Sequence, residues 1–346
     1  MNSTMSIFSP TRITPERVMG FTFGFAPPVI IETGIRLRVF DLLDEGAKTI
    51  DEIAGASGAS IRGLRTVLNA LVGLDLLVKD SLERYSLTIE SAEFLVTGKP
   101  TFHGAFFLLT SERMLSEWSK LRSIVRSGRP SHRINEEEYG TRFFQQFVED
   151  IFPIHLPAAR RLAETLQISN VAAPVSVLDL AAGSGVWSIA MAKESPHVRV
   201  TAVDWSGIIP ITKRVAEREG VAPQYRFVEG DLLTVDFGGG HSVATLGHIL
   251  HSEGEEKSRR LLKKAFDALA PGGNIAIAEI MVDPDRRGPL PALLFAVNML
   301  VNSESGDTFS LDEITSWLHA TNFDRVRTID VPGLAPKIIL ATKPSH

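Results

Sequence analysis

Through the first hundred residues, apolar positions recur at the three- and four-residue spacing of helices and then give way to short strand-like runs. Residues 49–52 (TIDE) have the spacing of a capping box, which predicts a short helix before a turn at residues 55–58. Ser60 can cap a second helix with apolar residues at helical spacing, and residues 76–88 predict a small β-hairpin. Helix, turn, helix and hairpin together predict a winged helix-turn-helix domain over residues 1–104.

Farther along the chain, the spacing of the apolar residues changes twice. From residue 105 to about 170 it stays helical, with a polar break at residues 126–139, and predicts a helical connector carrying helices on the substrate side. From Val175 onward, short apolar runs alternate with helical segments, which indicates an α/β domain over residues 171–346.

The second helix of the winged domain has few groups for a nucleic-acid partner. It offers Arg62, Arg65 and Asn69 but is otherwise mostly apolar, and many acidic residues surround it. Phosphate neutralisation supplies most of the affinity for DNA, so we expect no nucleic-acid binding from a chain of net charge -5. An apolar winged domain more often packs against another subunit, which predicts a homodimer formed through the N-terminal domain.

Composition limits both the cellular compartment that we expect for the protein and the kinds of chemical site that it can contain. With 0 Cys, the chain has no disulfide, thiolate zinc site or cysteine nucleophile. The N-terminus lacks a basic start followed by a long apolar core, and the apolar run over residues 290–301 is shorter than the roughly 20 residues of a spanning helix. We therefore expect a cytoplasmic protein with no membrane partner.

A buried strand leads through a glycine-rich turn into a helix, an arrangement that binds nucleotide-like cofactors. Residues 175–180 (VSVLDL) predict the strand, and the turn that follows contains Ala181, Gly183 and Gly185. A Cβ atom at these glycines would collide with a ligand, so their absence of side chains lets the backbone approach it. This turn is the first part of the predicted cofactor site.

Acidic residues end the next two predicted strands. Asp204 lies about twenty residues beyond the turn, where a carboxylate can accept both hydroxyls of a ribose. Asp231 follows the third strand and can accept an adenine amino proton, and the neighbours Trp205 and Leu232 belong to the same predicted site. The alternative is that such acids only cap the segments after them.

Asp179 distinguishes between two kinds of cofactor. It stands just before the glycine turn, and beside a pyrophosphate it would be a buried like charge, which is costly. S-adenosylmethionine has no phosphate and carries an ammonium and a sulfonium, which suit an acid. Ser188 also stands where nicotinamide-binding turns prefer glycine or alanine. We therefore predict S-adenosylmethionine as cofactor and S-adenosylhomocysteine as product.

Several motifs carry a family resemblance that spans nearly the whole chain. They are residues 177–185 (VLDLAAGSG), 230–231 (GD), 250–251 (LH), 268–273 (ALAPGG) and 275–279 (IAIAE), with a terminal strand pair at 326–331 and 337–342. The chain thereby resembles the small-molecule O-methyltransferases of plants and bacterial secondary metabolism. The resemblance implies a winged-helix dimerisation domain followed by a Rossmann-like class I methyltransferase domain with a seven-stranded, mostly parallel sheet.

The same resemblance implies catalytic roles. The family's base is the histidine of a Leu-His-Asp-Trp pattern, which corresponds to His251, and a supporting acid corresponds to Glu279. The chain departs from the pattern at three family positions, which here hold Ser252, Glu253 and, in place of a third acid, Thr308 with Asp307 beside it. His248 is an alternative base. A metal bound by His248, His251 and Glu255 is not expected, because a strand-to-loop segment splays alternate side chains.

The acceptor pocket has two candidate segments. Residues 291–302 form an apolar helix interrupted by two amides, and residues 143–147 form an aromatic cluster. Amides spaced by four residues share a helix face, so they can either bind an acceptor oxygen or form a solvent-facing stripe, and aromatic residues at helical spacing are more often core. The candidates are Phe144, Phe147, Phe295, Asn298, Met299 and Asn302, together with His248 and Asp307.

The sequence thus predicts methyl transfer from S-adenosylmethionine to a hydroxyl of a small aromatic or polyketide-like molecule, with no metal. Within the same class, methylation of carbon or nitrogen and non-methylating chemistry, such as decarboxylation or hydroxylation, stay open. From another class, a winged-helix regulator with a ligand-sensing domain is the alternative.

Overall fold

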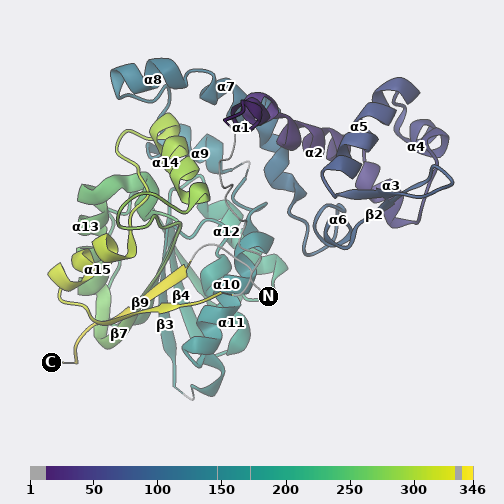
Figure 1. The fold of residues 1–346 in the computed structure, drawn as a ribbon. Coiled ribbons are helices and arrows are strands. Elements are labelled where there is room, and N and C mark those ends of the chain that lie inside the picture. The colour runs from purple at the N-terminus through teal and green to yellow at the C-terminus, as the bar shows by residue number, and fades with distance from the viewer. Residues whose placement is uncertain (1–12, 146, 172, 332–336, 346) are drawn as a thin grey trace. The chain divides into compact units, whose positions relative to one another are not determined.

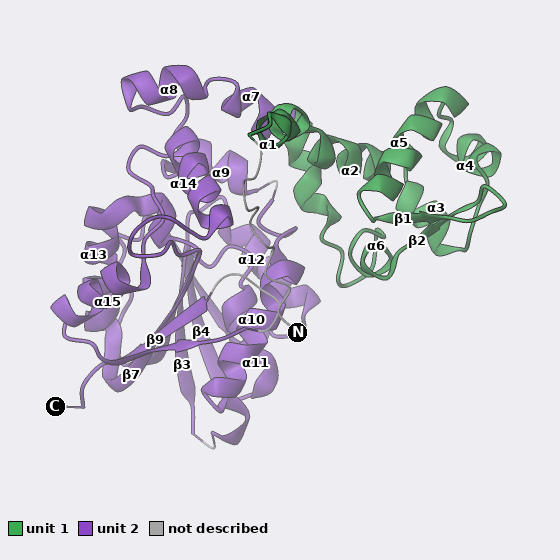
Figure 2. Cartoon of the chain, in the orientation of Figure 1, with its two compact units in different colours: residues 1–111 green, residues 112–346 purple. Residues whose placement is uncertain are grey.

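The computed structural model describes residues 13–145, 147–171, 173–331 and 337–345, and it divides into two compact units. Unit 1 comprises residues 1–111 and unit 2 residues 112–346 (Figure 2). The division falls just inside the segment predicted as a connector, most of which belongs to unit 2 because its helices pack on the α/β domain.

Unit 1 is mainly helical, and its helices α4 and α5 are followed by a short antiparallel strand pair. Its core includes Phe40, Leu68 and Tyr85, all at most 2% exposed. Thr49 forms the predicted capping box with Glu52, and Ser60 accepts a hydrogen bond from the Gly63 N–H. Its elements are α1 (Glu16–Met19), η1 (Gly20–Phe23), α2 (Ala26–Arg36), α3 (Val39–Asp44), α4 (Ile50–Ser57), α5 (Ile61–Gly73), the antiparallel strands β1 (Leu77–Lys79) and β2 (Tyr85–Leu87), α6 (Ile89–Phe94) and η2 (Gly104–Leu109).

One stretch of unit 1 is more apolar than the sequence analysis allowed for. Glu16–Arg36 is long and apolar enough to cross a membrane by length and composition, with a mean hydropathy of 1.4, and 17% of that window is buried. A mostly buried core helix of a soluble protein and a signal sequence near the N-terminus have the same length and composition, so this stretch alone does not establish a membrane span. Its exposed large side chains are Val18, Met19, Phe21, Phe23 and Phe25.

Unit 2 is built on a seven-stranded sheet in the order β5-β4-β3-β6-β7-β9-β8. Strand β9 runs antiparallel to β7 and β8, and the other pairs are parallel, so the predicted mostly parallel sheet with a reversed terminal pair is confirmed. The strands are β3 (Val175–Leu180), β4 (Val198–Asp204), β5 (Tyr225–Glu229), β6 (His241–Gly247), β7 (Leu269–Glu279), β8 (Asp324–Ile329) and β9 (Lys337–Thr342).

Helices cover both faces of this sheet, so its strands are apolar on both sides (Figure 1). Along β3, Val177 packs into one core and the adjacent Leu178 into the other, because successive side chains point to opposite faces. Helices α10 (Phe152–Thr165), α11 (Val186–Glu194) and α12 (Ile209–Arg218) cover the first face, and α13 (Leu250–Ala268) and α15 (Leu311–Ala320) cover the second. The carboxyl ends of the parallel strands meet at one edge.

Shorter helices surround that edge. They are α7 (Leu115–Trp118), α8 (Leu121–Ser127), α9 (Glu137–Phe144) and α14 (Leu290–Asn302), with η4 (Ile168–Asn170) and η5 (Ala222–Gln224) elsewhere in the unit, and η3 (Thr110–Met114) spans the division between the two units. The Trp118 indole N–H donates to Asn298 Oδ1 at 3.2 Å, and the Asn302 amide donates to the same oxygen at 3.0 Å. Asn298 therefore links α14 to α7, and the two asparagines bond each other within α14. Neither the acceptor-binding nor the solvent-stripe interpretation predicted these contacts.

Replacing Asn298 by alanine removes the shared acceptor of Trp118 and Asn302. We expect a loss of about 1–3 kcal/mol in unfolding free energy, because a part-buried indole N–H is left without a partner. The measurement is urea unfolding, with the exposed Asn170→Ala as control. Equal stability of the two variants would show that the Asn298 contacts contribute nothing.

Candidate active site

The glycine-rich turn after β3 has the left-handed backbone that a close approach to a ligand requires. Ala181, Gly183 and Gly185 have φ angles of 52°, 55° and 75°. A Cβ atom on Gly183 would lie 2.6 Å from Val148 Cγ2, so no side chain fits there without a shift. Ala181 is a non-glycine residue in this region, which stores strain at the turn.

Asp204, at the end of β4, is positioned by the turn itself. Its Oδ2 accepts the Gly183 N–H at 2.8 Å and its Oδ1 accepts the Trp205 N–H at 2.7 Å. Each carboxylate oxygen has a second lone pair, so both can also accept ribose hydroxyls. Burial raises the pKa of Asp204 to about 6, although the two backbone N–H groups oppose this shift.

Asp179 has protein partners where the sequence analysis placed a cofactor cation. It is 1% exposed, and its carboxylate accepts the Ser188 hydroxyl and, at 2.6 Å, the Thr245 hydroxyl. Burial raises the pKa of this carboxyl to about 6, and the two hydroxyls oppose the shift. In the described structure, Asp179 therefore links β3 to α11 and to β6 by hydrogen bonds. Its effect on a cofactor comes through its charge and through the position of the glycine-rich turn that follows it.

Asp231 and the loop after β4 border the same edge. Asp231 is exposed, and its Oδ1 accepts only the Leu233 N–H, at 2.7 Å, among the described residues. Leu232 packs against the second core. Phe144 of α9 lies beside Trp205, with ring centroids 6.3 Å apart.

The predicted aromatic cluster lies beside the loop that follows Asp204. The Gln145 amide donates to the Gly207 carbonyl at 2.9 Å, which places the end of α9 against the loop that follows Asp204. Phe147 stacks obliquely on Phe143 at 5.3 Å in the same cluster. The sequence analysis had assigned Phe144 and Phe147 to the acceptor.

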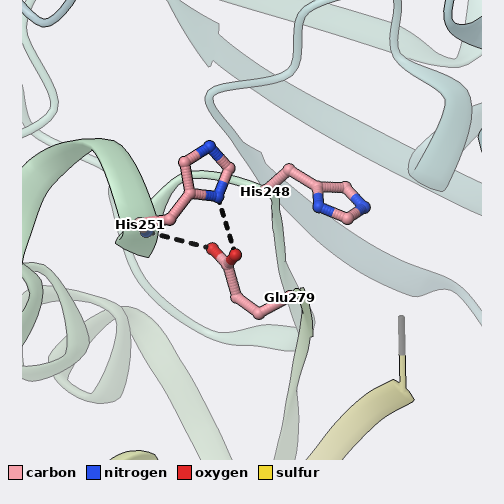
Figure 3. Close-up of side chains that lie close together, drawn as sticks. All are labelled: His248, His251 and Glu279. Carbon is pink, nitrogen blue, oxygen red and sulfur yellow. Dashed lines mark hydrogen bonds and ion pairs between the residues drawn. The ribbon is translucent and has the colours of Figure 1, made fainter. Parts of the chain in front are cut away.

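His251 and Glu279 meet at the ends of α13 and β7 (Figure 3). The His251 Nδ1 atom lies 2.7 Å from Glu279 Oε2, and the Leu250 N–H donates to Oε1 at 2.7 Å. The imidazole is 9% exposed. Burial alone would raise the pKa of Glu279, but the His251 ring, together with His248 and the His251 backbone N–H, holds it below its usual value.

An ionised Glu279 has no proton to donate, so His251 carries its proton on Nδ1. Its Nε2 atom then presents a lone pair on the other side of the ring. This arrangement is that of a general base held in one tautomer by a carboxylate.

Glu279 is the one carboxylate that orients His251 within the described residues. Thr308, at the family's third acid position, is fully buried and donates to the Ala292 carbonyl at 3.4 Å. Asp307 touches His251 through its backbone N–H, which donates to the His251 carbonyl at 2.9 Å, while its side chain faces Arg286. Asp307 therefore stabilises the backbone beside His251 through its N–H group, whereas Glu279 contacts the imidazole itself.

Helix α14 contributes one ring to this centre. Phe295 meets His251 edge to face, with centroids 4.9 Å apart and an interplanar angle of 83°. Met299, also predicted to face the acceptor, is 2% exposed and belongs to the core. Among the α14 candidates, Phe295 makes the ring contact with His251.

His248 lies beside this pair and packs on other rings. It stacks on His155 of α10 at 4.3 Å, and Trp187 lies 6.3 Å away. Burial lowers the pKa of His248 well below its usual value, assisted by His155, so its ring is neutral at pH 7. His155 was not predicted, because a histidine on a helix carries no signal of a partner far along the chain.

A metal ion would find three possible ligands here, although none is expected. Atoms of His248, His251 and Glu279 lie within 4.8 Å of one another. Glu279 already accepts three N–H groups, so an ion would have to displace the bond that orients His251. Glu255, weighed earlier as a ligand, instead bonds Arg259 at 2.8 Å.

A hollow of about 360 Å³ lies at the opposite edge of the sheet, lined in part by Ser176, Arg199 and His241. These residues stand at the amino ends of the strands, away from the glycine turn. Ligands of open α/β sheets bind at the carboxyl ends of the strands, so we keep the candidate active site at the edge that holds Asp204 and His251.

Two family models match the chain: an O-methyltransferase domain over residues 118–324 and an O-methyltransferase dimerisation domain over residues 19–97. The chain belongs to the O-methyltransferase family. This O-methyltransferase is an enzyme that uses S-adenosylmethionine, and the strand-end geometry fits that cofactor, because each Asp204 oxygen keeps a lone pair that can accept a ribose hydroxyl. The predicted family, fold, enzyme class and cofactor are confirmed.

Relatives match this O-methyltransferase nearly end to end. It is 29% identical to 3-hydroxy-5-methyl-1-naphthoate 3-O-methyltransferase of Streptomyces sahachiroi, over 92% of each chain. It is 30% identical to acetylserotonin O-methyltransferase of Bos taurus, over 81% of this chain and 84% of the relative. A Nostoc punctiforme structure titled as an O-methyltransferase superposes with a TM-score of 0.87 at 25% identity, covering 96% of this chain and all of that one.

Cofactor binding by this O-methyltransferase should weaken in mild acid. The pKa of Asp204 is raised to about 6, so the carboxylate takes up a proton as the pH falls through that value and loses acceptor capacity for the ribose. We expect the Kd for S-adenosylhomocysteine, measured by calorimetry, to rise between pH 7 and pH 5, and Asp204→Asn to flatten this dependence. An unchanged Kd across the range would contradict the ribose assignment.

Proposed function

We propose that this O-methyltransferase methylates a hydroxyl on a small aromatic or polyketide-like acceptor, with His251 as general base. When bound, S-adenosylmethionine supplies an electrophilic methyl group. Ionising a phenol of pKa about 10 at pH 7 costs roughly 4 kcal/mol, which a neutral imidazole in contact with the hydroxyl can largely offset. The observation that carries the proposal is the His251 Nδ1 to Glu279 contact of 2.7 Å, which leaves Nε2 to accept the hydroxyl proton.

Cofactor contacts are assigned in the same proposal. Asp204 holds the ribose, Asp231 and Leu232 border the adenine, and Ala181, Gly183 and Gly185 let the backbone approach. Phe144 and Trp205 close the ribose side, as their 6.3 Å contact suggests. Phe295 packs against the acceptor ring next to His251.

The names of relatives favour oxygen as the methylated atom. One acts on a hydroxynaphthoate and another in tetracenomycin polyketide synthesis, and both are O-methyltransferases. A neutral amine attacks the methyl group through its own lone pair and needs no base before transfer, so the oriented His251 argues for a hydroxyl rather than an amine.

A homodimer formed through unit 1 belongs to the same proposal. The dimerisation-domain match covers residues 19–97, and α1 to α2 expose a row of apolar side chains that a partner would cover. We place the enzyme in the cytoplasm, where a second copy rather than a membrane covers this row. Light scattering of the full chain should give twice the mass of one chain, 37.8 kDa.

The test is a methylation assay with S-adenosylmethionine and a panel of hydroxylated naphthalenes, quinones and polyketide phenols, read by mass. We expect at least one acceptor to gain a single methyl group on oxygen. Methylation confined to amines or carbon, or sequence-specific binding of duplex DNA at physiological salt with no methyl transfer, would overturn the proposal.

A further inference from the structure

Arg113 is a half-buried cation with no carboxylate partner. It makes no ion pair within the described residues, and Glu117, four residues farther on, bonds Lys120 at 2.8 Å instead. The Arg113 Nε atom is buried and has no hydrogen-bond partner in the same part of the chain. Taking a cation and a donor out of water in this way costs free energy unless an anion or another acceptor satisfies them.

Two aromatic side chains of α9 hold the guanidinium in place. Its Nη2 atom donates to the Tyr139 hydroxyl at 2.7 Å, and its Cζ atom lies 4.0 Å from the centroid of the Phe143 ring. Tyr139 is itself held by a parallel stack with His132, whose ring centroid lies 4.5 Å away. The cation is therefore fixed by rings, and its other N–H groups have no hydrogen-bond partner within the described structure.

The Tyr139 hydroxyl supplies a second donor beside the guanidinium. Because its oxygen accepts the bond from Arg113, its own hydrogen is left for another acceptor, and the described residues provide none. A carboxylate has two oxygens that can accept from an arginine and from a phenolic O–H at the same time. The pair of donors thus matches a carboxylate.

These donors lie among the helices at the carboxyl edge of the sheet. Phe143 meets Phe144 edge to face at 4.9 Å, and Phe144 lies beside Trp205 in the loop after β4. Just before α9, the Ile134 N–H donates at 2.9 Å to the carbonyl of Asn302 at the end of α14, and Figure 1 shows α9 and α14 next to one another. Helix α9 therefore reaches from the loop after β4 to the helix whose aromatic ring contacts the proposed base.

We propose that Arg113 and Tyr139 bind a carboxylate of the acceptor, so that the enzyme selects hydroxylated aromatic acids over neutral phenols. This inference rests on the proposed function and names the acceptor class within it. Arginine suits the role because its planar group can bond both oxygens of a carboxylate. The Phe143 ring covers one face of that group and leaves its edge for an anion.

The experiment compares 6-hydroxy-2-naphthoate and 6-hydroxy-1-naphthoate with their methyl esters, which keep the ring and the hydroxyl but remove the charge. We expect the wild-type kcat/KM to favour at least one acid over its ester by about tenfold or more, mainly through a lower KM. Arg113→Gln should lose this preference, and Arg113→Lys, which keeps the charge, should retain part of it. Calorimetric binding of the preferred acid to the enzyme saturated with S-adenosylhomocysteine should weaken in parallel.

Arg126→Gln is the matched control, because it removes an exposed arginine of α8 and should keep the wild-type preference. Urea unfolding verifies that Arg113→Gln folds, and Arg113→Met, which keeps the apolar stem on Phe143, takes its place if it does not.

A wild-type enzyme that treats acids and esters alike, or a folded Arg113 variant without charge that keeps the preference, overturns the inference. A folded variant with weakened affinity for S-adenosylhomocysteine also overturns it, since the guanidinium would then serve the carboxylate of the cofactor. If the wild type methylates no hydroxyl on any acceptor of the wider panel, the proposed function itself fails and this inference fails with it.

Discussion

Replacing His251 by alanine is expected to lower kcat by about 10²- to 10⁴-fold, the range that a positioned general base contributes. The affinity for S-adenosylhomocysteine should stay within a factor of two, because His251 bonds Glu279 and Phe295 and lies outside the glycine turn and the Asp204 carboxylate. The measurement is a steady-state assay of methyl transfer with calorimetry of cofactor binding. Glu279→Gln should show a smaller loss, since the amide can still accept from Nδ1.

His197→Ala is the matched control, since this histidine is exposed at the opposite edge of the sheet. A His251→Ala enzyme with wild-type turnover would exclude His251 as base and direct attention to His248. A variant that lost cofactor binding as well would show that His251 supports the fold of the site rather than the chemistry.

The Asp204→Asn variant should bind S-adenosylhomocysteine about 10²-fold more weakly. The amide keeps the shape of the side chain but turns an NH₂ group toward one of two backbone N–H donors, Gly183 or Trp205, and it has one acceptor oxygen left for two ribose hydroxyls. Hydrogen bonds to charged groups contribute about 1.5–3 kcal/mol, and about 2.7 kcal/mol corresponds to that change in Kd. Isothermal calorimetry at pH 7.5 measures it directly.

Asp236→Asn provides the comparison, because Asp236 also caps a backbone N–H, that of Gly238, but lies in the loop before β6. Its affinity for the cofactor product should equal that of the wild type. Equal affinities for Asp204→Asn and Asp236→Asn would remove Asp204 from the cofactor site.

The secondary structure near the site could be predicted from local patterns. The run VSVLDL is apolar at four of its six positions because helices cover both faces of β3, and the glycines after it mark a turn with positive φ. Capping signals at Thr49 and Ser60 identified the starts of two helices, because the hydrogen bonds concerned span three residues. The pairing of His251 with Glu279 came from family resemblance, since periodicity relates no residue to another 28 positions away.

Contacts between distant segments account for what the sequence did not show. Asp179 was expected to face a cofactor cation, whereas its hydrogen-bond partner Thr245 lies 66 positions away on β6. Asn298 was expected to meet an acceptor or solvent, yet its partner Trp118 lies 180 positions earlier. The His155–His248 stack likewise joins α10 to the end of β6, and only the folded sheet brings these residues together.

The most direct test of base-assisted transfer to a hydroxyl is to supply S-adenosylmethionine carrying a ¹³C methyl group and to locate the label in the product by NMR. With a hydroxylated naphthalene as acceptor, we expect the label on oxygen in the wild-type reaction, and little product with His251→Ala. A label on ring carbon, or equal product from the two enzymes, would contradict the role assigned to His251 and Glu279.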